Sequence, residues 1–66
     1  MPWVQYEVWS VDELGHEEII DTTNSLKEAN QLAEATLTDV DNGIVECIIY
    51  KETEDELEEV AVVVRE

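Results

Sequence analysis

Hydrophobic and polar residues alternate along residues 3–11, as expected for an extended strand with two different faces. The two faces consist of Val4, Tyr6 and Val8 on one side and of Trp3, Gln5, Glu7, Trp9 and Val11 on the other. The second face is half apolar because it contains both tryptophans. We therefore predict a strand at residues 3–11 whose second face is partly covered by the helix or by a partner.

A turn and a second strand follow. The segment Asp12–His16 contains Gly15, which can take the positive φ that a tight turn requires. Residues 17–22 then return as a short strand around Ile19 and Ile20. The first two strands are predicted to form a hairpin.

The start of a helix is marked by Ser25 and Glu28, which stand at the spacing of a capping box. Apolar residues then recur at helical spacing and form a narrow stripe of Leu26, Ala29, Leu32, Ala33 and Leu37. The alanines in this stripe would let the helix lie close against a sheet. We expect the helix to end near Thr38 or Asp39.

Two more strands follow a turn at residues 41–43. In the third strand, Val45, Cys47 and Ile49 are expected on one face and Ile44, Glu46, Ile48 and Tyr50 on the other. Residues 59–65 form the fourth strand, which is apolar on both faces and is therefore predicted to lie inside the sheet rather than at its edge. The acidic segment 52–59 lies between these strands and is expected at the tip of their hairpin.

These elements predict one small α+β domain over residues 1–66. The order is β-β-α-β-β, with one helix packed on one face of a four-stranded antiparallel sheet. A chain of 66 residues is near the lower limit for folding without disulfides or partners. We find no linker, internal repeat or second domain.

Charge changes the picture more than any motif does. The chain has 18 acidic residues and only three basic ones, for a net charge of −15. Such a charge repels nucleic acid and anionic membranes, favours a basic protein surface as partner, and destabilises the fold at low salt. The carboxylates fall in two clusters, Asp12, Glu13, Glu17, Glu18 and Asp21 in the first hairpin and Glu52, Glu54, Asp55, Glu56, Glu58 and Glu59 in the second. Two such clusters in a rigid frame could imitate the phosphates of DNA.

Candidate chemistry is sparse. The segment Asp39–Gly43 is similar to the start of a calcium-binding loop, but Gly43 and Tyr50 stand where that loop needs oxygen ligands. Cys47 alternates with apolar residues and is expected to be buried, and His16 is expected to be exposed in its turn. We therefore predict neither an enzyme nor a metal site or cofactor.

The sequence gives few signs of export. Residues 1–7 lack the basic and apolar regions of a signal peptide, and no apolar run reaches the length of a membrane span. Cys47 is the only cysteine, so no internal disulfide is expected. We expect a cytoplasmic protein that does not bind membranes.

In its size, its acidity and its lack of a catalytic motif, the chain resembles the small acidic anti-defence proteins encoded by phages. These include anti-CRISPR proteins that mimic the charge of DNA. The resemblance implies a non-enzymatic inhibitor in the host cytoplasm, acting on the basic DNA-binding surface of a defence complex such as a CRISPR effector or a similar nuclease. The clustered carboxylates would pair with Lys and Arg of the target, with Trp3, Trp9 and Leu57 as apolar anchors. Such an inhibitor would be a monomer or a weak homodimer.

Two other interpretations stay open. The first is an acidic protein–protein interaction or accessory module without DNA mimicry, which would dimerise through the face that carries Trp3 and Trp9. The second is a solvating or halophilic acidic surface, which predicts folding only in high salt. Net charge by itself speaks to solubility and association, so it does not choose among the three.

Overall fold

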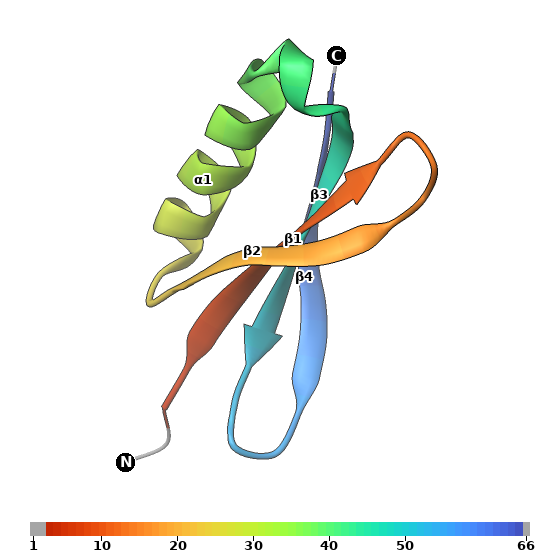
Figure 1. Ribbon diagram of the computed structural model, residues 1–66. Helices are drawn as coiled ribbons and strands as arrows, with labels where there is room; N and C mark the ends of the chain where they lie inside the picture. Colours follow the sequence, from red (N-terminus) through yellow and green to blue (C-terminus); the bar gives the residue numbers. More distant parts are fainter. Residues whose placement is uncertain (1–2, 66) are drawn as a thin grey trace.

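In residues 3–65, which the computed structural model describes, four antiparallel strands form one sheet and one α-helix lies across one of its faces (Figure 1). The elements are β1 (Gln5–Asp12), β2 (Glu17–Thr23), α1 (Leu26–Thr38), a short 3₁₀ segment η1 (Val40–Asn42), β3 (Ile44–Glu52) and β4 (Leu57–Val64). The predicted α+β class and the order β-β-α-β-β are confirmed. Residues 1, 2 and 66, which the predicted domain includes, lie outside the described part.

The strands are arranged in the order β2-β1-β3-β4, so β4 is an edge strand. The prediction that this strand lies inside the sheet is wrong. Its two apolar faces have a different cause: Ala61 and Val63 pack against the core, whereas Val62 and Val64 lie on the face that the helix leaves uncovered. Alternation along one strand cannot distinguish a covered second face from an exposed one.

The core lies between α1 and the two central strands. Val8, Cys47 and Ile49 are completely buried there against Ala29 and Ala33 of the helix. These alanines belong to the predicted stripe, and their small side chains let the helix backbone approach the sheet closely. The core is therefore made of β-branched and small side chains, without any Phe.

Side-chain hydrogen bonds cap the start of α1 and the start of the 3₁₀ segment that follows it. The Ser25 hydroxyl accepts a hydrogen bond from the backbone N–H of Glu28 at 3.1 Å, as the capping motif predicts. The helix ends at Thr38, also as predicted. The Asp39 carboxylate then caps η1, and Gly43 takes a φ of 73° where the chain turns into β3.

Three β-bulges shape the sheet, because the strand register shifts by one residue at Ile20, Val45 and Val60. The bulge at Val45 turns Ile44 toward the core, whereas the alternation had predicted it beside Glu46. Bulges also increase the local twist of a sheet and disturb its edges. Two of the three lie in the edge strands β2 and β4, which are thereby less suited to pair with another chain.

Within the described residues, no helix is long and apolar enough to span a membrane.

Candidate functional site

The sheet surface opposite α1 is here called the open face. Side chains alternate between the two faces of a strand, so the register of the four strands defines which residues lie there. Because Val8 and Ile49 face the helix, their neighbours Trp9 and Ile48 face away from it. By the same register, the open face consists of Gln5, Glu7, Trp9, Val11, Glu17, Ile19, Thr22, Glu46, Ile48, Tyr50, Glu52, Leu57, Glu59, Val62 and Val64.

Two aromatic rings occupy the middle of the open face. Trp9 and Tyr50 meet edge to face, with their ring centroids 6.3 Å apart at an interplanar angle of 83°. The indole N–H of Trp9 donates a hydrogen bond to Oε1 of Glu7 at 3.0 Å, which fixes the ring. Around the rings, Leu57 and Val64 leave more than half of their surface exposed. The face is therefore apolar at its centre and uncovered.

A hollow of about 270 Å³ opens on this face. Its lining contains one residue from each strand, Trp9, Glu17, Tyr50 and Leu57. Because residues from all four strands line the same hollow, the twisted sheet is concave at this point of its open face. Two aromatic rings, one aliphatic side chain and one carboxylate make a site suited to a group that is both flat and cationic.

Two carboxylates lie side by side next to the rings. The protonated form of Glu52 is favoured by a hydrogen bond to the Glu7 carboxylate, and partial desolvation and the repulsion between the two charges act in the same direction, so the pKa of Glu52 is raised above its usual value. Gln5 opposes the shift by donating an amide hydrogen bond to Oε1 of Glu52 at 3.2 Å. The pair holds negative charge at a fixed place on the open face.

The two acidic turns lie at opposite ends of the sheet (Figure 1). Gln5 pairs with Glu52 at one end of β1, and Asp12 pairs with Ile44 at the other. Seven residues of extended chain separate these pairs, which is roughly 23 Å. The clusters predicted in the two hairpins therefore do not form a single patch at one end of the molecule.

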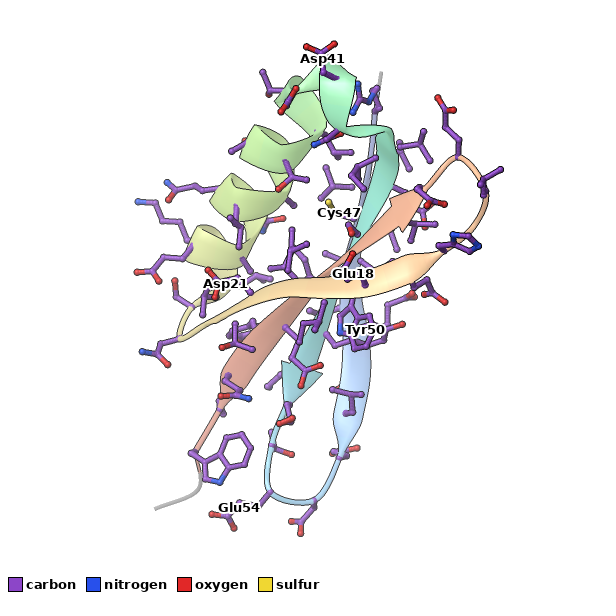
Figure 2. All side chains as sticks on the ribbon, in the orientation of Figure 1. Glu18, Asp21, Asp41, Cys47, Tyr50 and Glu54 are labelled. Atoms are coloured by element: carbon purple, nitrogen blue, oxygen red, sulfur yellow. The ribbon has the colours of Figure 1, made fainter. Side chains whose placement is uncertain are left out.

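The predicted carboxylates are also divided between the faces. The strand register places Glu17, Glu52 and Glu59 on the open face and Glu18, Asp21 and Glu58 on the helix side. Glu13 and the tip residues Glu54, Asp55 and Glu56 lie exposed in the two turns (Figure 2). Carboxylates therefore surround the domain on every side and reach both of its ends.

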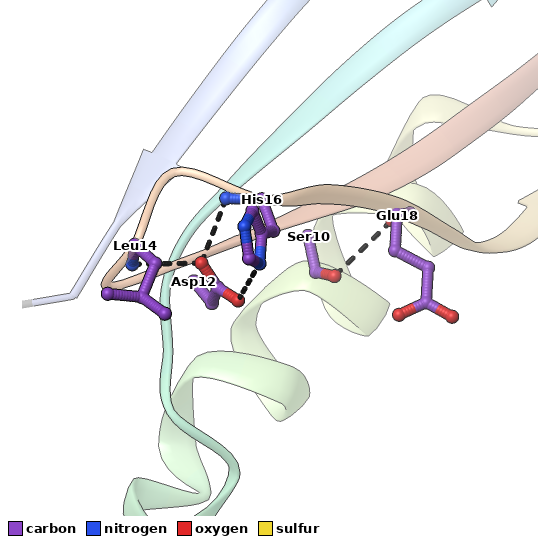
Figure 3. A network of polar contacts seen from close by, with 5 residues as sticks. All are labelled: Ser10, Asp12, Leu14, His16 and Glu18. Carbon is purple, nitrogen blue, oxygen red and sulfur yellow. Dashed lines mark hydrogen bonds and ion pairs between the residues drawn. The ribbon is translucent and has the colours of Figure 1, made fainter.

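Asp12 has a structural task in the first turn (Figure 3). Its Oδ1 accepts hydrogen bonds from the backbone N–H groups of Leu14 and His16, both at 2.9 Å, and Oδ2 lies 3.4 Å from Nδ1 of His16. The hydrogen bond from the His16 backbone is the main reason why the pKa of Asp12 is lowered. Gly15 completes the turn with a φ of 85°, as predicted.

The basic residues do not neutralise the open face. Lys51 faces the helix side, next to Glu58 in the register, and Lys27 lies on the helix. Arg65 donates from its guanidinium to the backbone carbonyls of Asp39 and Ile44, which ties the end of β4 to the end of the helix region. Across residues 3–65, no Lys or Arg side chain lies within 4.0 Å of a carboxylate; the one such contact of a basic side chain joins Asp12 to His16, which is charged only when protonated.

A second hollow, of about 460 Å³, lies between the end of α1 and the end of β4. Its lining is Glu34, Leu37, Thr38, Val63, Val64 and Arg65. Nη2 of Arg65 already donates to the backbone carbonyls of Asp39 and Ile44 and to Oδ1 of Asn42 at 3.3 Å, and its Nε is buried without a hydrogen-bond partner among the described residues. This hollow lacks the aromatic rings of the first.

Groups that could perform chemistry lie apart from one another. Cys47 is completely buried in the core, where burial raises the pKa of its thiol (Figure 2). His16 is exposed in the first turn, as expected. In the part of the chain that the structure describes, no three potential metal ligands converge on one point.

Sequence reasoning did not single out Tyr50 as a site residue, and it missed two acidic residues of the open face, Glu7 and Glu46. The alternation in the first and third strands had already placed them beside Trp9 and Tyr50. Grouping the acidic residues by segment rather than by face, however, leaves Glu7 and Glu46 outside both clusters. Trp3, a predicted anchor, precedes β1 and is 47% exposed, and Leu57 begins β4.

Comparison with known proteins gave no match to a family model, to a curated protein or to a solved structure.

Proposed function

We propose that this protein is a non-enzymatic inhibitor that mimics the charge of duplex DNA and occupies a basic nucleic-acid-binding site on another protein. The observation that carries the proposal is the density and distribution of its charge. The domain measures 41 × 20 × 16 Å and has a net charge of −15, or roughly one charge per 3 Å of its length, against one per about 1.7 Å for duplex DNA. A rigid polyanion of this kind competes for the Lys and Arg that hold phosphates.

The arrangement of the carboxylates supports the proposal. They lie on both faces and in both turns, as phosphates surround a duplex, and none of them forms a salt bridge with Lys or Arg among the described residues. The resemblance to phage-encoded anti-defence proteins makes a host defence complex, such as a CRISPR effector or a similar nuclease, the proposed target. The site of action would then be the cytoplasm of the host.

Capture from a bacterial lysate tests the class of partner. The immobilised protein should retain a DNA-binding complex that elutes at moderate salt and that excess duplex DNA displaces. A captured protein that duplex DNA leaves in place would contradict competition for a nucleic-acid site.

A set of variants then tests the role of charge. Replacing Glu54, Asp55, Glu56, Glu58 and Glu59 with Gln or Asn removes five charges, and the side chains of Glu54 and Asp55 make no hydrogen bond that holds the turn. We expect inhibition of DNA binding to be lost while the fold persists. The matched control exchanges Glu and Asp at the same five positions, which keeps the charge and should keep the inhibition. Equal inhibition by both variants would exclude mimicry through this hairpin.

The uncovered apolar surface of the open face favours a second candidate function, an acidic interaction module that dimerises. Val62 and Val64 are about half exposed there, at 48% and 57%. Sedimentation distinguishes the candidates, because this module should form a dimer that persists in salt and has no affinity for basic nucleases. A monomer at all concentrations and salt levels would eliminate it.

A further inference from the structure

We infer that the open face binds an arginine-bearing segment of a basic protein, with one guanidinium group seated against Trp9 and Tyr50 in the hollow that Glu17 and Leu57 also line. The cationic nature of the partner rests on the proposed function, whereas the place and the chemistry of the contact rest on the open face itself. Charge alone would make any exposed carboxylate equivalent. The hollow makes one position different from the rest.

Charge complementarity identifies the occupant. The register places five carboxylates on the open face and no basic residue: Glu7, Glu17, Glu46, Glu52 and Glu59. A second copy of this chain would bring five more carboxylates against these five, at a net charge of −15 per molecule. A cationic segment gains attraction on the same surface, and its aliphatic side-chain stems can cover Leu57 and Val62.

The shape and lining of the hollow favour arginine over other groups. A volume of about 270 Å³ is below the ~300–1,000 Å³ of sites that enclose small molecules, so the hollow suits one side chain better than a whole metabolite. Its walls offer two aromatic rings and the carboxylate of Glu17. A planar guanidinium stacks on aromatic rings and pairs with a carboxylate at the same time, which the compact ammonium of lysine does less well.

The aromatic site is already organised without a ligand. The hydrogen bond from Trp9 to Glu7 and the edge-to-face contact with Tyr50 hold both rings in place. A side chain entering the hollow therefore orders few protein groups, which lowers the entropic cost of binding. The contact should also resist salt better than surface ion pairs do, because part of it is apolar.

Two peptides of equal charge provide the first test. Nona-arginine and nona-lysine should be titrated into the protein while NMR follows the indole N–H signals of Trp3 and Trp9, assigned with Trp3→Leu. Nona-arginine should move the Trp9 signal more than the Trp3 signal and bind roughly five- to ten-fold more tightly than nona-lysine. Equal affinities without a change at Trp9 would overturn the inference. A Trp9 signal that moves with protein concentration alone would also overturn it, because a second copy would then cover the face.

Matched variants provide the second test. Trp9→Leu should abolish the preference for nona-arginine, whereas Trp3→Leu, which removes the other tryptophan, should keep it. Should Trp9→Leu fail to fold, Glu17→Gln should weaken nona-arginine binding several-fold more than Glu34→Gln, which removes the same charge on α1 across the sheet. Identical effects of the two Glu variants would contradict the site.

These results separate the inference from the proposed function. If Trp9→Leu inhibits a DNA-binding target as well as the parent does, while removal of the tip charges abolishes inhibition, the proposed function stands and the hollow is not the contact. If nona-arginine occupies the hollow but no charge variant changes inhibition, the contact stands and the mimicry fails.

Discussion

At the scale of single residues, the pair formed by Glu7 and Glu52 shows how this chain tolerates its charge. The two carboxylates are neighbours on the open face, and the pKa of Glu52 is raised mainly through its hydrogen bond with Glu7. The folded protein therefore holds the proton of Glu52 more tightly than the unfolded chain does. This contribution to stability is fully present below the ordinary pKa of 4.5 and is lost as the pH rises through the raised value.

Glu52→Gln should consequently stabilise the fold at neutral pH. The amide is neutral at every pH and can still donate a hydrogen bond to Glu7, so the repulsion disappears while the contact remains. We expect the Tm at pH 7 and low salt to rise by a few degrees, and this gain to shrink as the pH is lowered toward 4.5.

Glu54→Gln is the matched control, because it removes the same charge from the exposed hairpin tip. Thermal unfolding followed by circular dichroism between pH 4.5 and neutrality measures both variants. An equal gain in Tm for both variants would mean that only the net charge matters, and that the Glu7–Glu52 contact does not destabilise the fold beyond this effect.

Individual residues also show where the sequence stops predicting the structure. Ile44 turns into the core because a bulge at Val45 shifts the register, and nothing in the alternation of residues 44–50 signals the extra residue. Trp9 and Tyr50 lie 41 positions apart in the sequence, so their contact depends on how β1 and β3 pair. The alternation along a strand assigns each residue to one face of the sheet, whereas the pairing of the strands decides which residues on that face touch each other.

At the scale of the elements, the helix was the most predictable part because its signals are local. The cap at Ser25, the stripe of Ala29, Ala33 and Leu37, and the end at Thr38 all follow from spacing along the chain. The position of β4 was not predictable in the same way. A strand that is apolar on both faces can be covered by other elements on both faces, or it can lie at an edge with one face exposed. Only the order of the strands in the sheet distinguishes these cases.

The close approach of the helix to the sheet can be tested at Ala33, which is completely buried. Ala33→Leu adds three carbon atoms at a place without room for them and should lower the free energy of unfolding by about 1–3 kcal/mol. Ala35→Leu places the same side chain on the exposed side of the helix and should change stability by less than about 0.5 kcal/mol. Urea unfolding measures both variants. A similar loss of stability at the two positions would show that the alanines of the helix are not in close contact with the sheet.

At the scale of the whole molecule, the same net charge has opposite effects on folding and on binding. Carboxylates lie on both faces and at both ends of the described domain, and no Lys or Arg there forms a salt bridge with them, so compaction works against self-repulsion. Association with a basic partner instead gains from the same field. Salt screens both effects and should therefore stabilise the fold while it weakens the complex.

This opposition distinguishes the proposed inhibitor from a chain whose acidity only solvates it. Raising NaCl from about 10 mM to about 1 M shortens the screening length from ~30 Å to ~3 Å. The midpoint of urea unfolding should rise over this range, with little change in its slope, while the affinity for a basic DNA-binding target falls by at least an order of magnitude. A halophilic surface predicts instead that the protein is unfolded at the low-salt end, which circular dichroism would reveal at once. An affinity that does not respond to salt, in a protein already folded at about 10 mM, would exclude electrostatic mimicry and leave the apolar open face as the source of binding.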